Sequence, residues 1–244
     1  MPNNVNDNDQ CIYEILTILE ERDTAVGSGL LSQLLTEKGL VSSHATVGRL
    51  LSHMDLKKWT LRQGFKGRVI TDEGRTELDR MRSAQERLTY ESRFLQALEP
   101  KQKEDIIEIL VARKAIEREL ARLAAIRATN AEIADMEAVL PDNILERQPH
   151  KQFADHDIIF HKTLAKAAGN QVLSTALDLV RKDELFTPVY DYVRARLGGN
   201  LVVDHQQIVQ AIKQHDPEKA EQAMAQHVET MIKYVQFYWN SVKK

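Results

Sequence analysis

The chain has 244 residues, of which 43% are hydrophobic and 28% charged, and its formal net charge is −3. This composition is typical of a globular protein large enough for two domains, and it gives the whole chain no electrostatic bias toward nucleic acid or membrane. No stretch approaches the ~20 apolar residues that span a bilayer, the N-terminus lacks a signal peptide's apolar run, and the single cysteine, Cys11, predicts a cytoplasmic protein without an internal disulfide.

The first part of the chain alternates short helical patterns with breaks. Residues 1–9 are polar and are expected to form a disordered tail. Apolar residues then recur at helical spacing in three segments, which are separated at Gly27-Ser28-Gly29 and after Gly39. Ser42 or Ser43 can cap the third of these helices.

Two extended segments follow the third helix. Residues 59–61 and 68–70 flank Gln63-Gly64-Phe65-Lys66-Gly67, a turn-rich tip typical of a β-hairpin. Helix, helix, turn, helix and hairpin is the order of a winged helix. The pattern therefore predicts a winged helix-turn-helix domain over residues 10–71.

Charge favours DNA binding by this domain. Its third helix and hairpin are rich in lysine and arginine, and the only acid between His44 and Ile70 is Asp55. Such a helix suits the major groove of a DNA duplex, and a basic hairpin suits the phosphates alongside. The alternative is a solvated basic face on a protein-interaction domain. The predicted DNA contacts are Thr46, Arg49, His53, Lys66 and Arg68.

Residues 12–80 can be compared with a known module. With Arg68-Val69-Ile70-Thr71-Asp72-Glu73-Gly74-Arg75 closing the wing, they resemble the winged helix of some archaeal and bacterial regulators, which also begins some ribonucleases. The rest of this chain leaves no room for the catalytic body of such a ribonuclease.

A charged segment follows the wing. Leu78, Met81, Leu88 and Leu95 have heptad-like spacing over residues 72–99, which predicts a connecting helix that Pro100 ends. Such a helix could transmit motion between two domains or act as a passive spacer, and the sequence leaves both alternatives open.

Residues 100–244 are predicted to be all-helical, because no alternating strand pattern occurs in them. The expected fold is an antiparallel bundle of six or seven helices, so the whole chain is classed as mostly α. The predicted helices cover 102–128, 131–140, 150–168, 170–182, Leu185–Leu197, and a closing hairpin that turns at Asp216-Pro217.

Four residues of this second block are candidate metal ligands. Asp157 and His161 are four positions apart on one apolar helix face, whereas His205 and His227 each lie eleven positions from the Asp216 turn. A lone histidine in an apolar stripe is most often a core residue, but burying an unpaired carboxylate costs several kcal/mol. One carboxylate and three imidazoles together predict a divalent metal site, with zinc or nickel as the expected ion.

Arg113 also lies on an apolar helix face, so its guanidinium needs an anionic partner. Glu117, one turn away, could supply a structural ion pair. Alternatively, Arg113 contacts the carboxylate of an effector that binds beside the metal, since its planar fork matches a carboxylate.

The second block resembles the ligand-binding FCD domain of FadR-type regulators in the GntR superfamily, over roughly residues 102–235. The residues that carry the resemblance are Arg113-Lys114-Ala115-Ile116-Glu117, Leu120-Ala121-Arg122-Leu123-Ala124-Ala125, Asp157-Ile158-Ile159-Phe160-His161, Ala167-Ala168-Gly169-Asn170, His205 and His227-Val228. The resemblance implies a divalent metal held by the aspartate and three histidines, and a small organic acid that Arg113 contacts.

The N-terminal module departs from that superfamily. Its usual Pro-Ser-Glu-Arg run and Val-Arg-Glu-Ala-Leu segment are both absent here. The superfamily's operator pattern and dimer geometry are therefore not transferred to this chain.

These observations predict a ligand-responsive transcriptional regulator, not an enzyme, that binds a double-stranded DNA operator. A homodimer is expected because operators are commonly read as paired half-sites. The alternative function is a metalloenzyme that uses the Asp/three-His site for hydrolysis or oxidation, which requires a separate general base.

Overall fold

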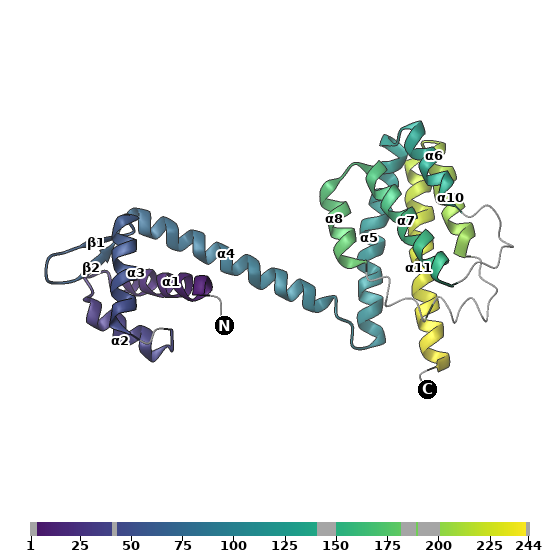
Figure 1. The fold of residues 1–244 in the computed structure, drawn as a ribbon. Helices are drawn as coiled ribbons and strands as arrows, with labels where there is room; N and C mark the ends of the chain where they lie inside the picture. The colour runs from purple at the N-terminus through teal and green to yellow at the C-terminus, as the bar shows by residue number, and fades with distance from the viewer. Residues whose placement is uncertain (1–3, 41–42, 141–149, 182–188, 190–200, 243–244) are drawn as a thin grey trace. The chain divides into compact units, whose positions relative to one another are not determined.

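The computed structural model describes residues 4–40, 43–140, 150–181, 189 and 201–242. The chain divides into two compact units, residues 1–94 and residues 95–244 (Figure 1). No helix in the described ranges is long and apolar enough to cross a membrane.

The first unit has the predicted winged-helix order. Its elements are α1 (Asn4–Arg22), α2 (Ser28–Glu37), α3 (His44–Leu56), β1 (Thr60–Arg62), β2 (Arg68–Ile70) and α4 (Asp72–Ala97), of which α4 continues past the end of the unit. Helix α1 begins at Asn4, so the disordered tail predicted for residues 1–9 is wrong over its last six positions. Asn and Asp are also favoured at the start of a helix. A polar composition alone therefore does not distinguish the first turns of a helix from a disordered tail.

The apolar faces of the helices form the core of this unit. Cys11 is buried in it, as are leucine and isoleucine side chains from α1 and α2 and the inner face of α3. From α4, Leu78 is buried, but Leu88 and Leu95 are 65% and 49% exposed. The heptad-like stripe of α4 is therefore packed only near its start.

The wing, residues 60–70, is fastened at its second strand. Strands β1 and β2 pair antiparallel, with Leu61 opposite Val69. Arg68 exchanges two backbone hydrogen bonds with Val26, and its guanidinium donates to both carboxylate oxygens of Asp55 on α3. Gly67 has a φ of 121°, and a Cβ at this position would lie 2.2 Å from the carbonyl oxygen of Val26. The wing therefore has one tightly defined attachment to the helices.

The second unit contains six helices within the described part of the chain. They are α5 (Lys103–Arg127), α6 (Asn130–Ala138), α7 (His150–Ala168), α8 (Gln171–Val180), α10 (Leu201–Lys213) and α11 (Pro217–Val242). Helix α5 packs against α7, α8, α10 and α11, and α10 also packs against α11 (Figure 1). The helical bundle is confirmed. The predicted helix Leu185–Leu197 lies outside the described residues apart from Val189, which is buried.

Side-chain caps explain where several of these helices begin. Gln102 and Asp105 form a capping box at the start of α5, and Thr129 and Glu132 form another at α6. The Asn170 side chain accepts a hydrogen bond from the backbone of Leu173, as expected for the cap of α8. These local signals fix the starts of α5, α6 and α8.

Replacement of Gly67 by alanine tests the attachment of the wing. We expect Gly67→Ala to destabilise the first unit by about 2 kcal/mol or more, because the new methyl group collides with backbone and φ is unfavourable for an L side chain. Urea unfolding followed by Trp59 fluorescence, in a Trp239→Phe background, measures the effect. Gly29→Ala is the control, since a Cβ at Gly29 meets no atom within 4 Å. Equal destabilisation by both changes would contradict the proposed contact.

Candidate metal centre

The four predicted ligands come together inside the second unit. Asp157 and His161 lie on α7, His205 lies on α10 and His227 lies on α11. Each offers one ligand atom, and these atoms all lie within 4.8 Å of one another. All four side chains are buried, so helices distant in sequence place them at one interior point.

The distances suit a single small cation. Oδ1 of Asp157 lies 3.5 Å from Nε2 of His161 and 3.2 Å from Nε2 of His205. Donors around a tetrahedral ion with ~2.0–2.1 Å bonds lie about 3.3 Å apart. Both Nε2 atoms are buried, and their described polar contact is with Oδ1 of Asp157. Buried nitrogen atoms in that situation are well placed to act as metal donors.

Burial also keeps two of the imidazoles in the form that binds metal. Desolvation lowers the pKa of His205, although Asp157 opposes this effect. Desolvation, with the nearby His205 and His161 rings, holds the pKa of His227 well below its usual range. Neutral imidazole has the lone pair that a metal ion requires. Phe160 stacks on His205 with ring centroids 4.1 Å apart and so covers one face of the site.

Glu117 on α5 stands behind His161. Its Oε2 lies 2.9 Å from Nδ1 of His161, and its Oε1 accepts a hydrogen bond of 2.8 Å from Nε of Arg113. Burial opposes ionisation of Glu117, but Arg113 and His161 hold its pKa well below the usual range. A carboxylate next to Nδ1 leaves Nε2 of His161 directed at the other ligands. Metal-binding histidines commonly have such a partner.

The contacts of Glu117 also show which anion pairs with Arg113. Its ion pair with Glu117 is the structural alternative that the sequence left open, and both side chains are almost completely buried. Contact between Arg113 and an effector stays a prediction. The sequence identified Glu117 as a partner for Arg113 but did not reveal its position next to His161.

Arg181 is a site residue that sequence reasoning missed. Its Nη2 donates to Oδ2 of Asp157 at 2.5 Å, and its side chain is 5% exposed. Although desolvation raises the pKa of Asp157, Arg181 and His161 hold it well below the usual range. Arg181 follows the last residue of α8, where a basic side chain is ordinary and therefore gave no signal. Its contact leaves Oδ1 of Asp157 facing the histidines.

The predicted DNA contacts all belong to the first unit. Arg49 and His53 on α3 and Lys66 on the wing are exposed, and Thr46 is half-buried near the Ser43 cap. Arg68 has only 15% of its side chain exposed, because it pairs with Asp55. Its observed role is to hold the wing against α3, and a contact between Arg68 and DNA stays a prediction.

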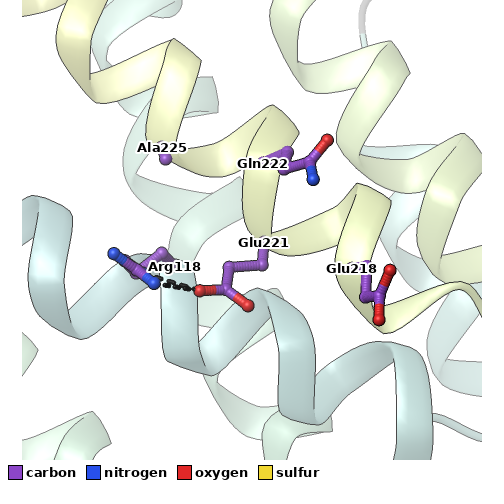
Figure 2. A pocket seen from close by; sticks show the side chains of 5 residues that line it. All are labelled: Arg118, Glu218, Glu221, Gln222 and Ala225. Carbon is purple, nitrogen blue, oxygen red and sulfur yellow. Dashed lines mark hydrogen bonds and ion pairs between the residues drawn. The ribbon is translucent and has the colours of Figure 1, made fainter.

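A surface pocket of about 320 Å³ lies elsewhere on the second unit, between α5 and α11 (Figure 2). It is lined by Arg118, Glu218, Glu221, Gln222 and Ala225. Figure 2 shows Arg118 paired with Glu221, so the one basic group of this lining already has an acidic partner. None of the four predicted ligands lines the pocket. The buried cluster is therefore the better candidate for a functional site.

Two family models match the chain. The FCD domain matches residues 108–230, and the ribonuclease R winged-helix domain matches residues 13–78. The first match includes the four predicted ligands and Arg113. The second includes all the predicted DNA contacts.

Curated relatives match about half of the chain. The Exu regulon transcriptional regulator of Escherichia coli K12 is 29% identical over 128 residues, which are 50% of this chain and 48% of that protein. The transcriptional repressor NanR of Edwardsiella tarda is 30% identical over 118 residues, which are 47% of this chain and 45% of that protein. The chain thus matches about half the length of these relatives.

A solved structure has a similar fold. The GntR-family transcriptional regulator from Pseudomonas syringae pv. tomato aligns with 100% of this chain and 90% of its own, with a TM-score of 0.52 and 17% sequence identity. At this identity, the likeness shows the fold alone.

The buried histidines predict how stability changes with pH. In the metal-free protein, we expect the second unit to lose stability as pH falls below about 6.5. Unfolded histidines take up protons there, whereas folded His205 and His227 resist protonation, so the unfolded state is favoured. The limiting slope is about 1.4 kcal/mol per pH unit for each such histidine.

Urea unfolding of chelator-treated protein between pH 7.5 and 5.5, followed by Trp239 fluorescence in a Trp59→Phe background, measures this slope. His227→Asn should reduce it, and His53→Asn, which changes an exposed histidine, should leave it unaltered. A slope that His227→Asn does not change would contradict the assignment to the buried cluster.

Proposed function

Since this chain belongs to the FCD-domain family, we propose that it is a transcriptional regulator that responds to a small organic acid. In this proposal the winged helix binds duplex DNA, and the helical unit binds a divalent metal and the acid. The single observation that carries the proposal is the buried convergence of Asp157, His161, His205 and His227. Its relatives with curated names are transcriptional regulators, which supports the same function.

The donor set supports a late first-row metal. Three imidazole nitrogens and one carboxylate oxygen suit zinc or nickel, and the Arg181 contact favours binding through Oδ1 of Asp157 alone. When bound, the ion would supply open positions for the oxygen atoms of an organic acid. Glu117 and Arg181 would hold His161 and Asp157 in place for it.

The effector is proposed to be a small carboxylate. Arg113 is buried on α5. The Glu117 side chain lies between it and His161, which belongs to the cluster. A guanidinium can pair with more than one anion, because its donors point in several directions. We therefore propose that Arg113 contributes to the affinity for the acid as well as supporting Glu117.

DNA binding is assigned to α3 and the wing, with Arg49 and Lys66 as exposed contacts. The effector can change DNA affinity only if it binds one state of the protein more tightly than another. A homodimer in the cytoplasm, which reads two half-sites, is part of the proposal.

The geometry favours this function over a metalloenzyme. Hydrolysis at the site would need a general base near the metal. Glu117 is the one further carboxylate that the described interactions place against the cluster, and both of its oxygens face His161 or Arg113. The low pKa that these contacts give it makes it a poor proton acceptor.

The metal site and DNA binding can be tested together. The chain is used to select duplexes from a random library, and affinity for the selected duplex is measured with and without Zn²⁺ and a panel of acetate, malate and citrate. We expect specific binding that a carboxylate changes only when metal is present. The variant His205→Ala/His227→Ala should lose bound metal and this response, but keep its helix content and its DNA binding.

Metal analysis and circular dichroism provide the two controls for that experiment. The paired change His44→Ala/His53→Ala removes two histidines of the first unit and should leave metal content unaltered. Equal metal retention by the His205/His227 variant would refute the site. Failure of the wild-type chain to select any duplex would refute the regulator function.

A second prediction concerns Arg113. We expect Arg113→Ala to weaken carboxylate binding by about 10-fold or more while metal is retained, since a charge-assisted pair contributes about 1.5–3 kcal/mol. Calorimetric titration of the zinc-loaded protein with the carboxylates measures this effect. Arg122→Ala, which changes a more exposed arginine of the same helix, is the matched control. Unchanged carboxylate affinity would leave Arg113 only its structural pair with Glu117.

A further inference from the structure

The tip of the wing presents an aromatic side chain to solvent. Phe65 lies between the strands of the hairpin and is 107% exposed relative to a reference residue. Leu61, on the neighbouring strand β1, is 59% exposed. Phe65 makes no contribution to the core of this unit, and together with Leu61 it leaves apolar surface on the wing available to a partner.

The wing is also rigid enough to place this ring. Arg68 is held by Asp55 and by two backbone bonds with Val26. Close to the tip, the backbone of Gln63 donates to the carbonyl of Gly67, and the Arg62 side chain donates to the carbonyl of Gly64. These bonds limit the freedom that Phe65 would lose on binding a partner.

The charges around Phe65 indicate the class of partner. Residues 56–70 contain no acid, and their exposed basic side chains are Lys57 and Lys58 before β1 and Arg62 and Lys66 close in sequence to Phe65. Acids flank this segment on both sides: Asp55 is paired with Arg68, and Asp72 and Glu73 lie in the first turn of α4. An exposed aromatic ring on a hairpin loop that also carries exposed cations fits a partner that combines anionic groups with flat apolar surfaces. Nucleic acid has both, as phosphates and stacked bases.

We propose that Phe65 is an apolar wedge that the wing inserts into the minor groove of duplex DNA, where it contacts and partly unstacks a base step. The inference rests on the proposed DNA binding by this unit. If α3 occupies the major groove, the hairpin beside it reaches the adjacent backbone and groove. Arg62 and Lys66 pair with phosphates, while the ring contacts the bases. Pyrimidine–purine steps such as TA are the easiest to open in this way.

The test uses the full chain and an A·T-rich duplex of ~20 base pairs, about two helical turns, with 2-aminopurine at a central TA step. Wild-type protein should raise the 2-aminopurine fluorescence as the step unstacks. Phe65→Ala should abolish this rise and weaken binding about 5- to 100-fold, the range expected for loss of one base–aromatic contact. Phe65→Trp should retain both. Leu88→Ala, which changes an exposed residue on α4, should alter neither.

The salt dependence of affinity separates the ring from its charged neighbours. Lys66→Ala should reduce the slope of log affinity against log salt by about 1, because one phosphate contact is lost. Phe65→Ala should leave the slope unaltered. Unchanged affinity and fluorescence for Phe65→Ala, when the wild type binds the duplex, would overturn the wedge but leave DNA binding intact. Tighter binding to a single strand than to the duplex would also overturn the wedge. Failure of the wild type to bind any duplex would overturn the proposed function itself.

Discussion

Charge pairing inside the helical unit is the constraint on which its site depends. Two carboxylates, Asp157 and Glu117, are buried in the bundle together with Arg113 and three histidines, next to a large apolar core. A buried carboxylate without a partner costs several kcal/mol, so each requires a cation within contact distance. Arg181 pairs with Asp157 and Arg113 pairs with Glu117. The Arg181–Asp157 pair links the end of α8 to α7, the Arg113–Glu117 pair lies within α5, and the Glu117–His161 contact links α5 to α7. Removing one member would leave an uncompensated charge in the core.

The same contacts account for the orientation of the ligand atoms. One oxygen of Asp157 is held by Arg181, and the other faces His161 and His205. Glu117 lies next to Nδ1 of His161, so that Nε2 faces the cluster. The arrangement therefore resembles a prepared binding site more than a proton-transfer site, because both carboxylates have low pKa values and committed partners.

A similar constraint organises the wing. Asp55 is the acid that accepts the Arg68 guanidinium, and the Thr60 hydroxyl donates to it as well. Although partial burial raises the pKa of Asp55, Arg68 and Thr60 lower it overall, so the carboxylate stays charged and keeps the hairpin on α3. The sequence predicted Arg68 as a DNA contact, but its guanidinium is largely buried and pairs with Asp55. The exposed cations and Phe65 are what remains for a partner.

The periodicity of apolar residues and the capping signals were enough to predict most of the described helices, the order of the winged helix, and the buried faces of α3, α5, α10 and α11, but not the exposure of the α4 stripe. They were also enough to predict that Asp157, His161, His205 and His227 are buried, because a polar residue in an apolar stripe can be recognised from the sequence alone. The tertiary structure decided which partners those residues have. Glu117 reached His161 through the packing of α5 on α7, and Arg181 reached Asp157 from the end of α8. No spacing rule predicts such contacts, since they depend on how separate helices are set against one another and on where buried charges must find a partner.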